Sequence, residues 1–284
     1  MYLASAAAIK GIAAKYGFTF KKGLGQNFLT SKEVLERIAD AAEIERGALE
    51  IGPGFGVLTT ELAERAKKVV ALEIDQRLIP VLNDTLSEYD NVKIINADVM
   101  KTDMKELLHR EFGGEKISIA ANLPYYITTP IITTLLESRL PIKNMVVMVQ
   151  KEVAERIGAK PSTKNYGALS VLCQYFTKPE LICVVPAGLF VPPPKVDSAV
   201  LRLRFLDKPS VEVKDEKMFF RTVRAAFSQR RKTLLNCLAS NFPAGKTVLS
   251  DMMKNIGIEP SRRGETLSLE EFALLSDSLC DIKA

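Results

Sequence analysis

The chain has 284 residues, of which 47% are hydrophobic and 26% are charged, and its formal net charge is +5. This length suits one large domain with a smaller one, and the apolar content is ordinary for a globular protein. No uncharged apolar run reaches the roughly 18 residues that cross a bilayer, and the mildly apolar start, interrupted by Lys10, lacks the basic leader of a signal peptide. We therefore expect a cytoplasmic protein that begins with a helix or arm and makes no membrane contact.

Residues 30–150 alternate between helical and strand patterns. Thr30 is expected to cap the first helix of this region, with Glu33 completing a capping box. The further elements are predicted strands at 48–51, 68–74, 92–96, 117–121 and 145–149, and predicted helices at 57–66, 77–86, 104–110 and 131–137. Such alternation is typical of a parallel sheet with helices on both faces.

The pattern changes after residue 150. Strands are predicted at 181–185 and 199–205, and we expect them to pair at the edge of the sheet with one strand reversed, which makes seven strands in a mostly parallel sheet. The strand signal then stops, and the remaining elements are predicted helices at 215–227, 229–240, 248–256 and 269–280. We therefore divide the chain into an α/β domain, residues 1–206, and a small all-α domain, residues 207–284.

A glycine-rich turn, residues 52–56 (Gly-Pro-Gly-Phe-Gly), joins a predicted strand to the next helix. Glycines let the backbone turn sharply and approach a ligand closely. The spacing differs from that of a dinucleotide pyrophosphate site, and Pro53 removes one amide that a phosphate would use. The turn therefore favours a nucleoside ligand without phosphate, with a plain turn as the alternative.

Two acids follow the next strands. Glu73 lies 21 residues after Gly52, where a carboxylate can accept both ribose hydroxyls, and Asp98 ends a strand where it can accept from an adenine amine. Asp75 is expected to cap the next helix. Either acid alone is more often a solvated loop residue. Because the carboxyl ends of parallel strands meet at one edge, we expect the glycine turn, Glu73, Asp98 and Asn122 to form one site.

The sequence Asn122-Leu123-Pro124-Tyr125 follows the buried strand at 117–121. Pro124 favours an extended or turned backbone, which holds an amide and an aromatic ring at the carboxyl end of the sheet. The amide oxygen and the neighbouring carbonyls are uncharged hydrogen-bond acceptors, and the tyrosine ring offers a flat face. These residues suit a planar base with an exocyclic amine, and the alternative is a strand-ending turn with a surface tyrosine.

The positions of the cysteines and of the single histidine disfavour a metal site. Cys173, Cys183, Cys237 and Cys280 are scattered, so we expect reduced thiols and no metal site. His109 lies in a charged helical stretch and is expected at the surface, so chemistry that relies on a histidine base is disfavoured.

Basic residues gather in three stretches that contain no acid, at 1–32, 156–179 and 217–250. This distribution favours a polyanion, with nucleic acid the preferred partner, and ordinary solvated faces are the alternative. Arg221, Arg224, Ser228 and Arg231 would share one helix face if the helix runs unbroken, and we expect phosphate contacts from it. The candidate RNA-binding residues are Lys21, Lys22, Arg221, Arg224, Arg230, Arg231 and Lys232.

Five motifs are spread over nearly the whole chain, at residues 25–29, 50–56, 122–125, 190–198 and 224–234. Together they resemble the class I S-adenosylmethionine-dependent methyltransferases and, more narrowly, the KsgA-type small-subunit rRNA adenine dimethyltransferases. The last two motifs are the most specific, and no motif position departs from the pattern. The resemblance implies a Rossmann-like fold for the α/β domain.

The resemblance also implies a cofactor and a substrate. It assigns the S-adenosylmethionine site to Asn27, Leu29, Gly52, Glu73, Asp98 and Asn122, to which we add the adjoining Gly54, Ile74 and Val99. The implied target is a pair of adjacent adenosines in the 3′-terminal hairpin loop of 16S rRNA, each dimethylated at N6 on a nearly assembled 30S subunit. We expect a monomeric enzyme that takes part in ribosome maturation.

The chemistry needs no metal, because the methyl group of a sulfonium is already electrophilic. If Asn122 Oδ1 and the carbonyl of Leu123 or Pro124 accept the two N–H groups of adenine, the amine lone pair points at the methyl group. Tyr125 is expected to stack on the extruded base. Phe190 is the candidate for the other face of the base, with a place in the core as its alternative.

Other functions stay open. A large-subunit rRNA methyltransferase of the antibiotic-resistance type shares the Asn-x-Pro-Tyr turn, but residues 190–198 and 224–234 count against it. A ribosome-assembly or transcription factor could keep the fold without catalysis, against which stand the intact Glu73, Asp98 and Asn122. A nicotinamide oxidoreductase is disfavoured by the glycine spacing.

Overall fold

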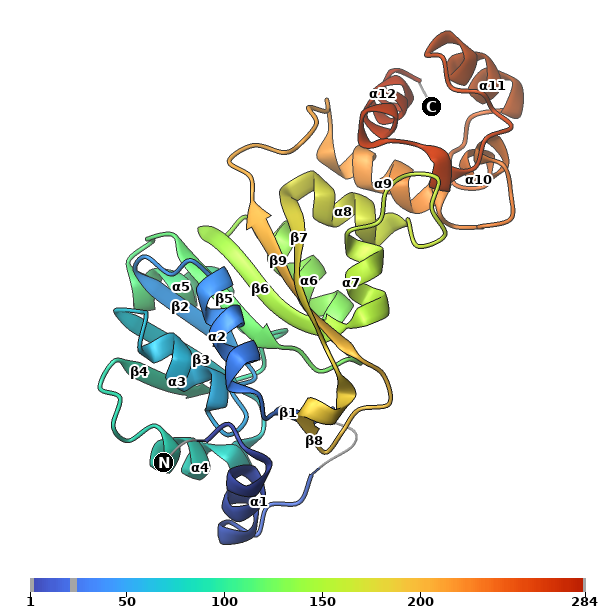
Figure 1. Ribbon diagram of the computed structural model, residues 1–284. Helices are drawn as coiled ribbons and strands as arrows, with labels where there is room; N and C mark the ends of the chain where they lie inside the picture. The colour runs from blue at the N-terminus through green and yellow to red at the C-terminus, as the bar shows by residue number, and fades with distance from the viewer. Residues whose placement is uncertain (1–2, 21–24, 283–284) are drawn as a thin grey trace. The chain divides into compact units, whose positions relative to one another are not determined.

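A computed structural model of the chain describes residues 3–20 and 25–282 (Figure 1). It contains two compact units, which we call the sheet unit, Met1–Ala154 with Lys178–Phe205, and the helical unit, Glu155–Thr177 with Leu206–Ala284. The segment Glu155–Thr177 therefore belongs with the C-terminal helices, a grouping that the boundary drawn at residue 206 did not anticipate. Within the described residues, no helix combines the length and the apolar character needed to cross a membrane.

In the described residues, the sheet unit contains nine strands and their connecting helices. The strands are β1 (Phe28–Leu29), β2 (Gly47–Ile51), β3 (Lys68–Glu73), β4 (Val92–Asn96), β5 (Ile117–Asn122), β6 (Ile142–Gln150), β7 (Thr177–Val185), β8 (Phe190–Val191) and β9 (Ser198–Phe205). The helices are α1 (Ala6–Lys15), α2 (Lys32–Ala41), α3 (Val57–Ala63), α4 (Ile79–Thr85), α5 (Met104–Phe112) and α6 (Thr128–Glu137), followed by α7 (Lys151–Ile157), which crosses into the helical unit.

Seven strands form one sheet in the order β4-β3-β2-β5-β6-β9-β7, with helices on both faces (Figure 1). The pairs from β4 to β6 are parallel, whereas β9 runs antiparallel to β6, which confirms the prediction of a mostly parallel sheet with a reversed strand near its edge. The strand order reverses between β2 and β5, and in open α/β sheets ligands bind outside the carboxyl ends of the strands at such a point. The topology therefore directs attention to the loops after β2, β3 and β5.

A second, two-stranded sheet pairs β1 with β8 and brings the segment before α2 to the main sheet. Thr30 donates through its amide and its hydroxyl to the carbonyl of Leu189, at 2.8 Å each. Because Thr30 is used in this way, α2 is capped one residue later, by Ser31 Oγ, which accepts from the Val34 amide. The predicted capping box of Thr30 and Glu33 is therefore wrong.

The helical unit contains α8 (Ala168–Phe176), α9 (Glu216–Ala226), α10 (Leu234–Ala239), α11 (Lys246–Asn255) and α12 (Leu269–Asp281). Its core includes the rings of Tyr175 and Phe219, which stack with centroids 4.8 Å apart. Four helices were predicted after residue 207 and four are found, but α10 begins at Leu234, with Thr233 as its cap, and not at residue 229.

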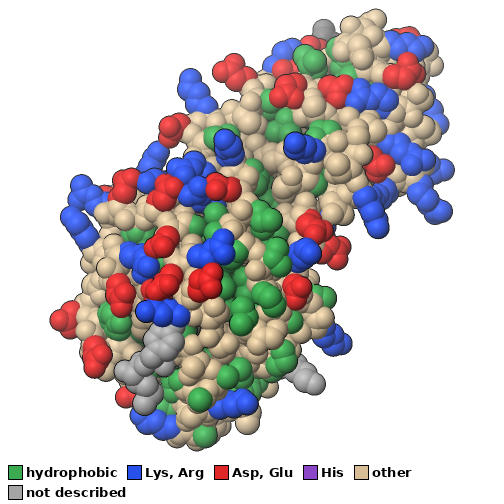
Figure 2. Space-filling model, viewed as in Figure 1, with side chains coloured by type: hydrophobic (Ala, Val, Ile, Leu, Met, Phe, Trp, Pro, Cys, Tyr) green, Lys and Arg blue, Asp and Glu red, His purple; other side chains and the backbone are tan. Residues whose placement is uncertain are grey.

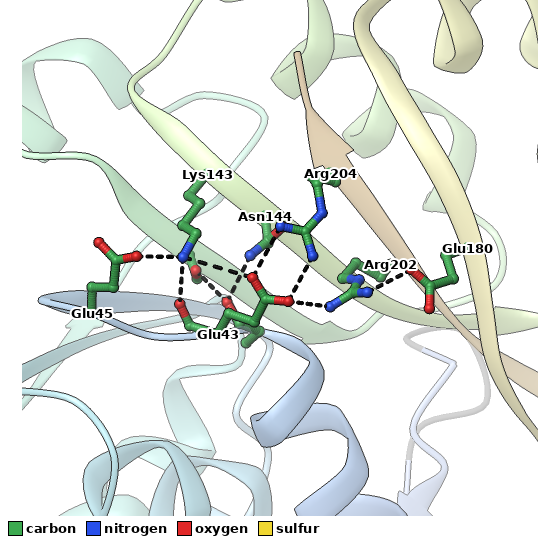
Figure 3. Close-up of polar contacts among 9 residues, drawn as sticks. Glu43, Glu45, Lys143, Asn144, Glu180, Arg202 and Arg204 are labelled. Atoms are coloured by element: carbon green, nitrogen blue, oxygen red, sulfur yellow. Dashed lines mark hydrogen bonds and ion pairs between the residues drawn. The ribbon is translucent and has the colours of Figure 1, made fainter. Parts of the chain in front are cut away.

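A network of ion pairs holds the amino-terminal edge of the main sheet together (Figure 3). Glu43 follows α2 and adopts a positive φ of 46°. Its Oε1 accepts from Arg202 and from Arg204 on β9, at 2.6 Å each, and its Oε2 lies 3.7 Å from Lys143 Nζ on β6. Chiefly through the hydrogen bond from Arg204, these cations hold the pKa of the Glu43 carboxyl below its usual value of 4.5.

Replacement Glu43→Gln should lower the free energy of unfolding at pH 7 by roughly 1 kcal/mol, a figure reduced for solvent screening because the side chain is 34% exposed. Since the folded-state pKa is depressed, the carboxylate stabilises the fold above pH 4.5 and loses this effect as the pH falls through the folded-state value. Urea unfolding of both proteins at pH 7 and pH 3 measures the difference, which should shrink at pH 3. Glu45→Gln, at a more exposed acid that pairs with Lys143, is the control and should cost less. Equal losses for the two variants would contradict the network.

Candidate functional site

A cavity of about 100 Å³ opens at the carboxyl end of the main sheet, at the point where the strand order reverses. Its lining includes the segment from Gly25 to Leu29 and the loop after β2. It also includes Glu73 at the end of β3 with Ile74 after it, and Asn122 at the end of β5 with Pro124 beyond it. Segments far apart in the sequence thus converge on one hollow. Of the predicted cofactor residues, it brings together Asn27, Leu29, Gly52, Gly54, Glu73, Ile74 and Asn122.

The glycine turn shapes one wall of the cavity. Gly52 and Gly54 have φ values of 73° and 62°, in the left-handed region that favours glycine. A Cβ on Gly54 would lie 2.5 Å from the ring of Phe28, whereas one on Gly52 would meet nothing within 4 Å. Gly54 is therefore needed for packing against β1, and Gly52 leaves its backbone open to a ligand.

Glu73 is held in place by backbone amides. Its Oε2 accepts from the Gly54 amide at 3.1 Å and its Oε1 from the Asp75 amide at 2.8 Å, and the residue is only 4% exposed. Burial raises the pKa of the Glu73 carboxyl, and the two amides partly offset the shift. Asp75 caps the following 3₁₀ turn by accepting from the Arg77 amide, which confirms its predicted role.

Glu50 is a second buried acid in the cavity wall, and the sequence analysis missed it as a site residue. It lies on β2 with 1% exposure, and within the described structure neither its Oε2 nor the nearby Thr59 Oγ1 has a hydrogen-bond partner. Burial raises the pKa of Glu50 to about 8, against a lowering effect of the nearby Thr59 hydroxyl and with a smaller raising effect of the charge of Glu73. The available signal was a carboxylate inside an otherwise apolar strand, which is rarely buried without a purpose.

Asn122 reaches the cavity from the end of β5, and its amide has a defined orientation. Nδ2 donates to the carbonyl of Asn27 at 2.9 Å, so Oδ1 is the end left to accept a hydrogen bond. The Pro124 carbonyl already accepts from the Ile127 amide and from Thr128 Oγ1. No donor in the described part of the chain bonds to the carbonyl of Leu123.

Tyr125 and Phe190, the two aromatic residues expected around a base, have different surroundings. Tyr125 is partly buried and its hydroxyl lies 2.7 Å from Ser198 Oγ, while the neighbouring Tyr126 is 57% exposed and lines the cavity. Phe190 is 2% exposed and packs in the hydrophobic core on β8, the alternative that its sequence left open. Tyr126 was not among the predicted site residues.

Asp98 and Val99 lie after β4 and outside the lining of the cavity. Asp98 Oδ1 accepts from the Met100 amide at 2.9 Å, and its carboxylate is 3.9 Å from Lys101 Nζ. Among the described residues, no group of three or more His, Cys, Asp or Glu side chains is arranged to hold a metal ion.

The predicted RNA-binding cations fall into distinct groups. Arg221 donates to the carbonyl of Asn241 and lies over the ring of Phe242, and Arg230 donates to the carbonyl of Lys164. Of the remaining candidates, Arg224, Arg231 and Lys232 are exposed and have no partner in the described structure, whereas Lys21 and Lys22 lie outside the described residues. Lys and Arg side chains project from the helical unit in Figure 2.

The shared helix face across residues 221–231 required an unbroken helix, and that condition is not met. Helix α9 ends at Ala226, with Phe227 as its C-cap, and residues 228–233 form turns before α10. Ser228 and Arg231 therefore do not continue the face of α9 that carries Arg221 and Arg224.

Comparison with known proteins identifies close relatives. Residues 17–280 match the family model described as ribosomal RNA adenine dimethylase. A protein of Bacillus cytotoxicus named ribosomal RNA small subunit methyltransferase A is 57% identical over 276 residues, which cover 95% of this chain and 94% of that protein. A protein of the same name in Bacillus cereus is equally similar.

Two solved structures share the fold at 29% sequence identity. A dimethyladenosine transferase from Plasmodium falciparum superposes with a TM-score of 0.74, covering 87% of this chain and 95% of that one. The 23S rRNA methyltransferase ErmE superposes with a TM-score of 0.69, covering 89% of this chain and 100% of that one.

The buried acid Glu50 should make stability depend on pH. Because its pKa rises from 4.5 in the unfolded chain to about 8 in the fold, the stability that it contributes is complete below pH 4.5 and is lost as the pH rises through 8. Between pH 5 and pH 8, the free energy of unfolding should fall by up to about 4 kcal/mol more in the wild type than in Glu50→Gln, at about 1.4 kcal/mol for each pKa unit.

Urea unfolding of the protein without ligands, at steps between pH 5 and pH 8, measures this difference as a slope, so that any pH-independent cost of the new amide cancels. Glu61→Gln serves as the control, since that buried acid is paired with Arg65. Parallel pH profiles for the wild type and Glu50→Gln would show that Glu50 is ionised throughout.

Proposed function

The chain belongs to the ribosomal RNA adenine dimethylase family and has a class I methyltransferase fold, and we propose that it methylates two adjacent adenosines in the 3′-terminal hairpin loop of 16S rRNA. Each adenosine would become N6,N6-dimethyladenosine, with S-adenosylmethionine as donor, on a nearly assembled 30S subunit. The observation that carries the proposal is the cavity that the glycine turn, Glu73 and Asn122 share. The names of the 57% identical relatives support the small subunit as the substrate.

The cavity fits S-adenosylmethionine on chemical grounds. When bound, this cofactor supplies an electrophilic methyl group on a positively charged sulfur. Glu73 and Glu50 line the hollow, and Glu50 Oε2 has no hydrogen-bond partner in the described structure. Because a nearby positive charge favours the ionised form of a buried carboxyl, these two acids match a cationic nucleoside better than an anionic one. Gly52 lets the backbone approach the ligand, and Glu73 would accept the ribose hydroxyls. Asp98 and Val99 would contact the adenine from the rim.

The target amine would be held by two uncharged acceptors. Asn122 Oδ1 is the first, because its amide nitrogen is committed to Asn27. The second is the carbonyl of Leu123, since that of Pro124 already accepts two hydrogen bonds. With both N–H groups engaged, the nitrogen lone pair is directed toward the methyl donor, and the proton leaves to water after transfer because an alkylated amine is strongly acidic. No histidine base is required.

The adenine must leave its stack to reach this position, which favours a loop nucleotide. We assign Tyr125 to stack on one face of the base. Its ring is fixed by the contact of its hydroxyl with Ser198. Phe190 would support this region from the hydrophobic core on β8, and Tyr126 lines the cofactor cavity.

The choice between ribosomal subunits rests on the relatives and on the cations. ErmE, a 23S rRNA methyltransferase, has a similar fold, but the proteins with 57% identity carry the small-subunit name. Arg224, Arg231 and Lys232 are free to contact phosphates. We further propose that the enzyme acts as a monomer in the cytoplasm, where ribosomal subunits are assembled, and that it needs no metal ion.

Asn122→Ala should reduce methyl transfer to small subunits at least about 100-fold, the scale for losing one preorganised hydrogen-bonding group. The assay offers labelled S-adenosylmethionine with unmethylated small subunits, large subunits and naked rRNA in parallel. The wild type should label small subunits, and Asn122→Ala should retain its affinity for them. Thr129→Ala, at an exposed position of α6, is the control and should keep full activity.

Label that appears only in large subunits would overturn the proposed substrate. Equal loss of transfer and of RNA binding in Asn122→Ala would show that Asn122 has a structural role and not a chemical one.

Combined replacement of Arg224, Arg231 and Lys232 by alanine should weaken binding to small subunits and flatten its salt dependence. Each lost phosphate contact lowers the slope of log K against log salt by about 0.7–0.9, so the slope should fall by roughly 2. Titration between low and moderate salt measures it. Arg221→Ala is the control, because its guanidinium is used within the helical unit, and it should lower thermal stability while the slope stays unchanged. An unaltered slope in the triple variant would exclude these residues from the RNA surface.

A further inference from the structure

A second hollow, of about 480 Å³, lies in the sheet unit outside the cavity described above. Its volume falls within the range of about 300–1,000 Å³ that is typical of small-molecule sites. It is lined by Gln150, Lys151, Glu152, Ala187, Lys195, Val196 and Asp197. None of these residues was assigned a role in the proposed methylation.

The hollow lies beside the place where the target base would be held. Asn122 pairs with Met148 on β6, and Gln150, two residues further along β6, pairs with Ser198 on β9. Ser198 Oγ contacts the hydroxyl of Tyr125 at 2.7 Å, and Asp197, the residue before it, lines the hollow. A hydrogen bond from Tyr125 to Ser198, followed by the peptide bond to Asp197, therefore connects the tyrosine proposed to stack on the base with the rim of the second hollow.

The walls of the hollow are fixed by the backbone. Asp197 accepts from the Lys151 amide through its carbonyl and from the Ala187 amide through Oδ1, at 3.0 Å each. These bonds tie the start of α7 to the segments before β8 and β9. The three prolines at 192–194, which lead into Lys195, restrict the backbone further. The hollow is thus preformed in the protein without a ligand.

The chemistry of the lining matches a nucleotide. Lys151 and Lys195 are exposed, and neither ammonium group has a partner in the described structure, so both can bind phosphate. Glu152, Asp197 Oδ2 and Gln150 supply acceptors for an adenine amine and for ribose hydroxyls. Two cations next to two carboxylates suit a whole nucleotide, which carries both kinds of group, better than a bare anion.

We propose that this hollow holds the nucleotide next to the target adenosine in the rRNA strand. The inference rests on the proposed function, in which two adjacent adenosines are modified in turn at a site that accepts one extruded base. An RNA strand has a direction, and the hollow lies on one side of Asn122 and Tyr125. It therefore holds the nucleotide on one fixed side of whichever adenosine is the target, which is the other adenosine of the pair in one reaction and a nucleotide outside the pair in the other.

The test is a double variant, Lys151→Ala with Lys195→Ala, assayed under single-turnover conditions on unmethylated small subunits. Mass spectrometry of the excised rRNA fragment gives the dimethylation rate at each adenosine separately. We expect the rate to fall about 10-fold at both adenosines, equivalent to about 1.4 kcal/mol, because either target has a neighbouring nucleotide whose phosphate the two lysines would bind. Affinity for S-adenosylmethionine, measured by calorimetry, should be unchanged and shows that the variant is folded.

Lys105→Ala with Lys178→Ala is the matched control, because it removes the same charge from exposed lysines of the sheet unit that do not line the hollow. It should leave both rates at their wild-type values. No slowing in the test variant, or slowing at only one adenosine, would overturn the inference while leaving the proposed function intact. A wild-type protein that modifies neither adenosine would remove the proposed function, and this inference with it.

Discussion

The hydrogen bond from Asn122 Nδ2 to the carbonyl of Asn27 constrains the chemistry at the carboxyl edge of the sheet. A carboxamide has a donor end and an acceptor end, and fixing the donor leaves the acceptor for a ligand. The bond joins residues 95 positions apart, and it exists because β1 pairs with β8 and brings the segment before α2 to the end of β5. The polarity of the site thus depends on a two-stranded sheet that is separate from the main one.

The same edge carries two buried acids that have no cationic partner among the described residues. Glu73 is stabilised by two backbone amides, whereas Glu50 Oε2 is left without a partner. Burying an unpaired polar group costs stability, so the fold sacrifices some stability at the position where a cationic cofactor would favour the ionised form of these acids. The amino-terminal edge is arranged differently, because the acid Glu43 there is surrounded by three cations. Paired charges hold one end of the sheet, and the other end keeps groups available for a ligand.

The sequence predicted the strand ends well because their signals are local. Buried apolar runs followed by Gly52, Glu73 or Asn122 specify a strand and its exit without reference to the rest of the chain. The errors arose where a residue distant in the sequence decides the role of a side chain. Thr30 and Ser31 are both good helix caps, and only the Leu189 carbonyl, 159 residues away, takes Thr30 out of that role. Glu50 was passed over because the pattern marks it as part of a strand, and its lack of a partner is visible only in three dimensions.

The basic residues of the helical unit show the same limit of prediction from sequence. A helical period through Arg221, Arg224 and Arg231 is present in the sequence, but α9 ends before Ser228, and the carbonyl of Asn241 binds Arg221. The spacing therefore identified a basic surface, but it did not identify which side chains of that surface are free to contact a phosphate. In the sheet unit, by contrast, Lys151 and Lys195 belong to no periodic pattern in the sequence. The hydrogen bonds of Asp197 bring them together in the fold. A recognition surface for RNA is defined by which charges lack a partner after folding, and that property depends on tertiary contacts more than on charge count.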